Sequence, residues 1–255
     1  MIKSILITGG GSGIGAALAQ ALAARGCDVL LAGRRPAPLM ALADHSSHIT
    51  AHPSDVTVAQ DQDALVAALA TLPAPRGIFH GAGYFQLGKL DALSAADWTR
   101  SFETNVTARW ALSTKAAPHL RGGRVLFIGS DSARNIRLGG AAYSIAQAAS
   151  ETLRRALQAE WAGRNIAVSA FKPGLVDTDM VQGFLQVHQD EFPAKKDFES
   201  YFDRGEFVTP QTVAQFASWV LLDVSMERFV QTEWDIRDPA HHPAWSGSGA
   251  KPDTV

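Results

Sequence analysis

The sequence predicts an α/β fold, in which helices flank both faces of a doubly wound parallel sheet within a single domain. Three observations indicate this fold. Short apolar runs alternate with longer, often alanine-rich segments along most of the 255 residues, as strands and helices alternate in such sheets. The first apolar run leads through a glycine-rich turn into the first helical segment. No internal repeat and no linker divides the chain, so we expect one sheet.

Composition limits the class of protein and its partners. Hydrophobic residues make up 46% and charged residues 19%, which is typical of a globular protein with an ample core. The net charge of -2, with no lysine or arginine run, argues against a nucleic-acid partner. The single cysteine, Cys27, excludes an internal disulfide framework and suits a reducing compartment. With no cleavable leader and no apolar stretch of membrane-spanning length, we expect a cytoplasmic protein without a membrane partner.

Apolar runs that end at small or turn-forming residues predict seven strands. We place the strands at residues 2–7, 27–32, 48–53, 78–83, 124–128, 166–171 and 228–236. We place helices at residues 16–25, 58–72, 94–119, 141–161 and 210–222. Residues 178–209 break the alternation with mixed aromatic and charged side chains, so we expect either a lid or substrate wall there or an ordinary surface insertion. The domain should cover residues 1–238, and residues 239–255 should form an irregular tail without a metal site.

The turn at residues 8–15, Thr-Gly-Gly-Gly-Ser-Gly-Ile-Gly, is the first candidate binding site. A strand that enters a helix through such a turn directs the helix's free N–H groups and its dipole at a ligand above the turn, which suits a phosphate. Gly9 should allow the turn, Gly13 the close approach of an anion, and Gly15 close packing of helix and strand. The alternative is an ordinary turn between strand and helix. The candidate binding residues here are Gly9, Gly11, Ser12, Gly13, Ile14 and Gly15.

Two arginines follow the second predicted strand. A dinucleotide site usually carries a carboxylate there to bind the adenosine ribose, but this chain has Gly33, followed by Arg34 and Arg35. Because a guanidinium group suits a 2′-phosphate, we expect NADP(H), with NAD(H) the less favoured cofactor. The alternative is that Arg34 and Arg35 only mark the start of a helix.

Small and polar residues also follow the third and fourth strands. Asp55, next to Val56, could cap the following helix or bind an adenine amino group. The fourth strand ends in His80, Gly81, Ala82 and Gly83, and small residues are needed where backbone passes close to a ligand. His80 by itself is more typical of a structural role.

Polar side chains near the fifth strand are the candidate catalytic residues. Ser130 follows the strand at residues 124–128, at the edge where open α/β sheets bind ligands. Tyr143 begins the next helix, and Gln147 lies one turn later on the same face. Asn105 lies within an earlier helix, where an asparagine is usually a local hydrogen-bonding residue.

Together these features resemble the short-chain dehydrogenase/reductase family over roughly residues 3–236. The residues that carry the resemblance, in the family's order and spacing, are Thr8 to Gly15, Asp55-Val56, His80 to Gly83, Asn105, Ser130, Tyr143 and Pro173-Gly174. Ser130 lies 13 positions before Tyr143, as in the family's catalytic pair. The resemblance implies a Rossmann-type fold and hydride transfer to or from a nicotinamide cofactor.

The same resemblance implies a role for each site residue. Tyr143 would be the proton donor to a substrate carbonyl, or the base toward an alcohol. Ser130 would bind that oxygen, and Asn105 would support a water-linked proton path. Val176 and Thr178 would line the carboxamide end of the nicotinamide. The residues expected to bind cofactor beyond the glycine turn and the two arginines are Asp55, Val56, His80, Gly81, Ala82, Gly83, Pro173, Gly174, Val176 and Thr178.

The chain departs from the family pattern at Gln147, where the family has lysine. That lysine normally binds the nicotinamide ribose and lowers the pKa of the tyrosine. Gln147 can bind a ribose but supplies no charge, and one nearby cation moves a pKa by about 1 to 3 units. We therefore expect proton transfer slowed by about 10- to 1000-fold near neutrality and a higher pH optimum for alcohol oxidation. Lys172 could supply a replacement cation, or could equally point into solvent or toward the cofactor phosphates. His80 is a second departure, since the family most often has asparagine there.

The sequence thus predicts an NADP(H)-preferring oxidoreductase that interconverts a carbonyl and a secondary alcohol on a small molecule. The alternative is a cofactor-binding protein that has lost turnover and acts as a sensor, regulator or assembly partner. Lyase or isomerase chemistry also occurs in families of this kind, but no feature here favours it. The aromatic residues of the segment 178–201 indicate an apolar or ring-bearing substrate. By resemblance we expect a homodimer or homotetramer, with Ala108, Ala111, Ala156 and Ala159 either at the contact or in the protomer's own core.

Overall fold

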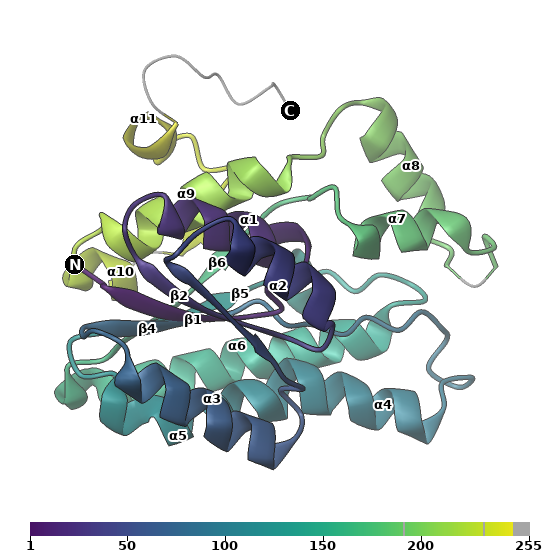
Figure 1. Cartoon of the computed structure of the whole chain (residues 1–255). Coiled ribbons are helices and arrows are strands. Elements are labelled where there is room, and N and C mark those ends of the chain that lie inside the picture. Colours follow the sequence, from purple (N-terminus) through teal and green to yellow (C-terminus); the bar gives the residue numbers. More distant parts are fainter. Residues whose placement is uncertain (191, 232, 247–255) are drawn as a thin grey trace.

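The computed structural model describes residues 1–190, 192–231 and 233–246, and its centre is one parallel sheet (Figure 1). The strands are β1 (Ser4–Thr8), β2 (Asp28–Gly33), β3 (Ile49–Pro53), β4 (Arg76–His80), β5 (Arg124–Ile128), β6 (Ala167–Lys172) and β7 (Trp234–Asp235). Their order in the sheet is β3-β2-β1-β4-β5-β6-β7. The chain builds outward from β1 in one direction and then from β4 in the other, so the order reverses between β1 and β4. Ligands of open α/β sheets bind at such a reversal. The predicted single-domain, doubly wound fold is confirmed.

Helices cover both faces of the sheet. They are α1 (Gly13–Ala23), α2 (Pro36–Asp44), α3 (Ala59–Thr71), α4 (Ala95–Phe102), α5 (Ala108–Ala116), α6 (Ala141–Trp161), α7 (Asp179–Gln186), α8 (Lys195–Asp203), α9 (Pro210–Leu222), α10 (Met226–Gln231) and α11 (His242–Trp245). Figure 1 shows α1, α2 and α9 over one face and α3, α5 and α6 over the other, with α7 and α8 projecting to one side. No helix in the described ranges is both long and apolar enough to cross a bilayer.

The alternation of side chains along β1 divides the core into two halves. Ile5 and Ile7 belong to the half under α1 and α9, whereas Leu6 belongs to the half under α3 and α5. All three side chains are fully buried. Both faces of a parallel sheet are covered by helices, so its central strands are apolar throughout. This is why a continuous apolar run, without strict alternation, correctly predicts β1.

Several predicted boundaries are confirmed, and others need correction. Strand 124–128 and helices 141–161 and 210–222 coincide with β5, α6 and α9. The expected helix 94–119 consists of α4, a π-helical turn (Glu103–Thr107), α5 and a 3₁₀ turn (Ala117–His119) in direct succession. A single π-helical turn inside a longer helix frequently lies at a functional site, and Asn105 lies in this one.

Two segments differ in kind from the prediction. Residues 228–236 were expected as a strand, but α10 extends to Gln231 and only Trp234–Asp235 pair with β6. Phe229 on α10 is buried in the core next to Trp234, whose indole N–H donates to the Phe229 carbonyl at 3.2 Å. A short apolar run does not distinguish helix from strand, and here packing decides. The expected irregular segment 178–209 contains α7 and α8, because Phe184, Phe192 and Phe198 form a small core of their own.

The tail is only partly described. Residues 239–246 include the short helix α11, so this part is not wholly irregular, while residues 247–255 lie outside the described residues. His241 is buried beside Trp234, with ring centroids 5.0 Å apart. Within the described ranges no three His, Cys, Asp or Glu side chains are grouped as a metal site would require.

Candidate functional site

The glycine turn after β1 has the conformation that its sequence predicts. Gly9 (φ +70°) and Gly13 (φ +51°) adopt left-handed conformations that favour glycine. A Cβ on Gly15 would lie 2.3 Å from the Gly9 carbonyl oxygen, so only glycine lets α1 pack this closely on the turn. Ser12 is the N-cap residue of α1, but its side chain does not cap the helix. The first N–H groups of α1 are therefore available to an anion above the turn.

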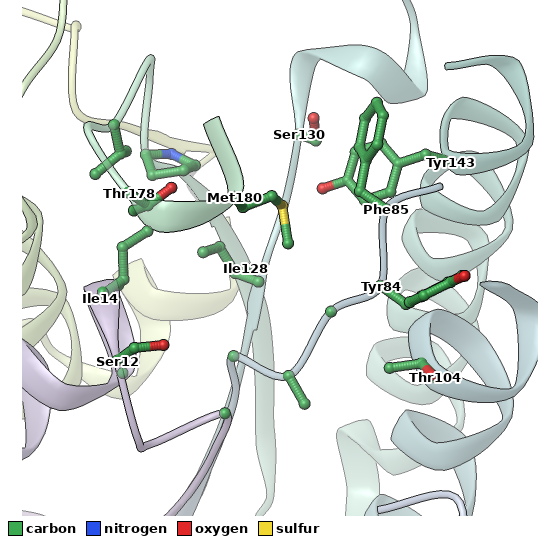
Figure 2. Close-up of a pocket in the computed structure, with 18 of the residues that line it drawn as sticks. Ser12, Ile14, Tyr84, Phe85, Thr104, Ile128, Ser130, Tyr143, Thr178 and Met180 are labelled. Atoms are coloured by element: carbon green, nitrogen blue, oxygen red, sulfur yellow. The ribbon is translucent and has the colours of Figure 1, made fainter. Parts of the chain in front are cut away.

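The turn opens into a cleft of about 890 Å³ along the carboxyl ends of the strands. Figure 2 shows Ser12, Ile14 and Thr178 on one side of this cleft, and Tyr84, Phe85 and Tyr143 on the other. The sequence-predicted residues that line it are Gly9, Gly11, Ser12, Gly13, Ile14, Gly15, Arg34, Arg35, Asp55, Val56, Gly81, Ala82, Gly83, Ser130, Tyr143, Gln147, Pro173, Gly174, Val176 and Thr178. The structure thus brings together almost all of the predicted site residues, from both halves of the sheet.

The His80 side chain does not line the cleft, and its assignment to cofactor binding is corrected. His80 is buried, with Nε2 2.8 Å from the Ser113 hydroxyl of α5 and its ring 4.7 Å from that of Phe127. Burial, together with the positive charge of Arg109, holds the pKa of His80 well below its usual value. The alternation of side chains along β4 directs His80 to the face of the sheet that α5 covers, while the backbone continues through Gly81 to the cleft.

Asn105 is also outside the cleft lining, although it supports one wall. Its side chain is fully buried; Oδ1 accepts from the Tyr84 amide at 3.1 Å and Nδ2 donates to the Tyr84 carbonyl at 2.7 Å. These two bonds fix the loop that follows β4 and carries Tyr84 and Phe85. The structure therefore shows the local hydrogen-bonding role, and the water-linked proton path stays a prediction.

Arg34, Arg35 and Asp55 line the cleft near the ends of β2 and β3. Arg34 and Arg35 are exposed, and neither forms an ion pair within the described residues. Asp55 does not cap α3, whose N-cap residue is Val58. Instead its carboxylate accepts from the Thr57 amide at 2.9 Å and from the Thr57 hydroxyl at 2.7 Å. Although partial burial raises the pKa of Asp55, the bonds from Thr57 and the nearby positive charges outweigh burial and lower it.

Tyr143, Ser130 and Gln147 meet at the other end of the cleft. The Tyr143 ring packs against Phe85, with centroids 4.6 Å apart (Figure 2). Enclosure by the surrounding protein raises the pKa of Tyr143 above its usual value, against the opposing effects of the Arg109 charge and of hydrogen bonding with Ser130 and Gln147. A phenol with a raised pKa is protonated at neutral pH. It can donate a proton to an oxygen placed beside it.

Lys172 and Arg109 are two of the cations that line the cleft with Tyr143 and Gln147. Lys172 lines the cleft but lies 3.4 Å from the carboxylate of Glu233, which offsets its charge. Arg109 on α5 is 2% exposed and lines the cleft with Tyr143 and Gln147. The sequence reasoning missed Arg109. The available signal was an arginine one helical turn after Asn105, on the helix face that is otherwise occupied by alanine and leucine.

The remaining wall of the cleft is apolar and aromatic. It comes from the segment after β6 and from the loop after β4. Phe184 packs on Phe85 with ring centroids 4.3 Å apart, and Met180 projects into the cleft (Figure 2). This part of the segment 178–209, which belongs to α7, therefore forms one wall of the cleft. The expectation that this wall contacts a substrate stays a prediction.

Comparison with a family model and comparison with individual proteins both find dehydrogenases. Residues 3–188 match the family model described as short chain dehydrogenase. The 2,3-dihydro-2,3-dihydroxybenzoate dehydrogenase of Escherichia coli (strain K12) is 28% identical over 231 residues, covering 88% of this chain and 91% of that protein.

Two solved structures are similar over almost the whole chain. A putative NAD(P)-dependent gluconate 5-dehydrogenase from Beutenbergia cavernae, with NADP bound at low occupancy, is 26% identical with a TM-score of 0.78, covering 92% of this chain and 94% of that one. BdcA in complex with NADPH is also 26% identical, with a TM-score of 0.75 and coverage of 91% and 93%.

Proposed function

Because this chain belongs to the short-chain dehydrogenase family, we propose that it is an NADP(H)-preferring oxidoreductase that interconverts a carbonyl and a secondary alcohol. The family binds nicotinamide cofactors, and its oxidoreductases act on small molecules. The observation that carries the proposal is the position of Ser130 and Tyr143 in the same cleft as the glycine turn.

The cleft fits a dinucleotide along its length. The free N–H groups at the start of α1 would hold the diphosphate, and Asp55 and Val56 would line the adenine. Arg34 and Arg35 have no carboxylate partner in the described structure and would bind a 2′-phosphate. The presence of NADP or NADPH in the two similar solved structures supports this preference. When bound, the cofactor would supply or accept a hydride at its nicotinamide ring.

Tyr143 would supply the proton of the reaction. As the substrate carbon gains the hydride, the Tyr143 phenol would give its proton to the carbonyl oxygen, so that a carbonyl becomes an alcohol. In the reverse direction the phenolate would take the proton of the alcohol. Ser130 would donate a hydrogen bond to the same oxygen and orient it. Gln147 would stand where the family has lysine; its amide can both donate to and accept from a ribose hydroxyl, but it carries no charge.

The substrate would be apolar or ring-bearing. Phe85, Met180 and Phe184 form an apolar wall beside Tyr143, and aromatic walls favour flat, apolar molecules. The dihydroxybenzoate dehydrogenase among the relatives is named for a ring-bearing diol, which is consistent with this expectation.

Assembly and location also belong to the proposal. We propose a homodimer or homotetramer in the cytoplasm, with residues 1–238 as the domain. Ala108 and Ala111 are buried within the protomer and would not lie at the contact. Ala156 on α6 is exposed, and Trp110 on α5 is 51% exposed. The outer face of α5 and α6 would therefore form the contact between protomers. Sedimentation of the wild type and of Trp110→Glu would test it, since the variant should dissociate.

Titration with NADPH and with NADH, followed by turnover against a panel of carbonyl compounds, tests the proposed function. We expect tighter binding of NADPH, and oxidation of NADPH by at least one apolar ketone or aldehyde. Tyr143→Phe should bind NADPH equally well and lose the turnover. Tight binding without turnover from pH 6 to 10 would instead favour a sensor, regulator or assembly role. The absence of Lys at position 147 is the feature that favours that second function.

A further inference from the structure

Arg109 is a buried positive charge for which the described structure shows no carboxylate partner. We propose that the Arg109 guanidinium supplies, from α5, the positive charge beside Tyr143 that Gln147 cannot supply from α6. Arg109 would be a positioning residue that acts on Tyr143 through its charge. This inference deepens the proposed function and rests on it for the role of Tyr143.

The contacts of Arg109 hold its guanidinium in the lining of the cleft. Nη1 donates to the Ile128 carbonyl at 3.1 Å and to the Ser150 hydroxyl at 2.9 Å, and Nη2 donates to the Ala82 carbonyl at 3.4 Å. Ile128 ends β5 and Ala82 follows β4, so the group bridges the ends of two neighbouring strands. Ser150 lies on α6 one helical turn after Gln147, on the same face. The charge is therefore fixed against the helix that carries Tyr143.

All of these partners are neutral, and Nε has no hydrogen-bond partner among the residues that the structure describes. Burying an unpaired charge costs several kcal/mol, so a residue used only for packing would be apolar. Burial lowers the pKa of Arg109 to about 10, with the charge of Tyr143 opposing the shift. The guanidinium consequently keeps its charge at neutral pH, in a low-dielectric setting where that charge acts strongly on its neighbours.

Arg124 shows what a purely structural buried arginine looks like in this fold. Its guanidinium donates to the Val220 carbonyl at 2.9 Å and to the Leu221 carbonyl at 2.8 Å. These carbonyls belong to the last turn of α9, where a cation stabilises the helix. Arg124 does not line the cleft. Arg109 donates to no helix end; its guanidinium lies 5.9 Å from the centroid of the Phe127 ring and lines the cleft.

Few titratable groups face Arg109 from the elements packed against it. His80 on β4 stays neutral, because burial and the Arg109 charge both lower its pKa. Tyr143 on α6 is the group whose pKa the charge lowers against the effect of enclosure. Lys172, at the end of β6, is paired with Glu233. Tyr143 is therefore the acid on which the Arg109 charge acts.

The test measures the ionisation of Tyr143 directly, without cofactor or substrate. The chain has three tyrosines, so a Tyr84→Phe/Tyr201→Phe background leaves Tyr143 as the one tyrosinate signal in ultraviolet difference absorbance. In this background Arg109→Gln, which keeps hydrogen-bond donors but no charge, should raise the titration midpoint of Tyr143 by about 1 unit or more. Arg109→Lys keeps a positive charge, so its midpoint should be closer than that of Arg109→Gln to the midpoint of the Tyr84→Phe/Tyr201→Phe background. Arg109→Gln/Gln147→Lys should lower it again, because lysine restores the charge from α6.

A second variant leaves Arg109 in place, in case Arg109→Gln does not fold. Ser150→Asp puts a carboxylate where the Ser150 hydroxyl now accepts from Nη1, so it should offset the charge and raise the midpoint of Tyr143. Ser150→Asn is the matched neutral control and should have little effect. If Arg109→Gln folds and leaves the midpoint of Tyr143 unchanged, the inference is overturned. If Arg109→Gln does not fold, an unchanged midpoint in Ser150→Asp overturns it. A shifted midpoint in a protein without any turnover would overturn the proposed function instead and leave the electrostatic link standing.

Discussion

Replacement of Gly15 by alanine tests whether the turn after β1 holds the cofactor as proposed. The added Cβ would lie 2.3 Å from the Gly9 carbonyl oxygen, 2.9 Å from its carbonyl carbon and 3.1 Å from the Gly10 Cα. These are backbone atoms that no change of rotamer can move aside. To reach ordinary contact, α1 and the turn must separate by about 1 Å.

The protein has little freedom to make this separation. Leu18 and Leu22 on α1 are fully buried in the core half that contains α9, so moving the helix disturbs well-packed side chains. Overpacking of this kind costs about 1 to 3 kcal/mol of the free energy of unfolding. The same displacement stretches bonds from the first N–H groups of α1 to a bound phosphate. Loss of one charge-assisted bond, about 1.5 to 3 kcal/mol, weakens NADPH binding by about 10-fold or more.

Denaturant unfolding and fluorescence titration with NADPH measure the two effects. Gly163→Ala is the matched control, because a Cβ at Gly163 would have no neighbour within 4 Å. Gly15→Ala should be less stable than Gly163→Ala and should bind NADPH more weakly. Equal stability and equal affinity in the two variants would refute the reasoning about the turn.

Three further predictions concern ionisable groups that line the cleft or lie next to it. Arg34→Gln/Arg35→Gln should weaken NADPH binding by about 10-fold or more and leave NADH binding unchanged, as measured by titration; an equal loss for both cofactors would contradict a 2′-phosphate site. Because the pKa of Tyr143 is raised and alcohol oxidation needs its phenolate, the oxidation rate should still increase at about pH 10, whereas carbonyl reduction should be nearly constant around neutrality. An oxidation rate that levels off near neutrality would exclude Tyr143 as the base. His80 is neutral in the folded protein, because burial and the Arg109 charge lower its pKa. In the unfolded chain it binds a proton below about pH 6.5. The contribution of His80 to the free energy of unfolding should therefore fall by about 1.4 kcal/mol for each pH unit below that value. His80→Asn should remove this contribution in urea unfolding between about pH 5 and 7, and an unchanged slope would show that His80 is protonated in the fold.

The sequence predicted the elements whose signal is local. The boundaries of β5, α6 and α9 coincide with the prediction, because each has a long or uniformly apolar pattern and a clear start or stop. Thr209 caps α9 by accepting from the Thr212 amide, and Pro210 occupies its first turn. The strand predicted at residues 228–236 is wrong for most of its length. A short apolar run such as the one that contains Phe229 and Trp234 is compatible with either a helix or a strand. The conformation of this segment is decided by the packing of Phe229 and Trp234 into the core half that also contains residues of α9 and β6.

The same division holds for the site. Sequence alone determined that a glycine turn, two arginines, a serine and a tyrosine lie at the carboxyl edge of one sheet, since strand order and chain direction bring those positions together. Only the tertiary structure decided that His80 faces the core and that Lys172 is paired with Glu233. Only the structure showed that Arg109 lines the same cleft as Tyr143. Periodicity and turn chemistry act between near neighbours in the chain, whereas burial and charge pairing depend on elements that meet only after folding.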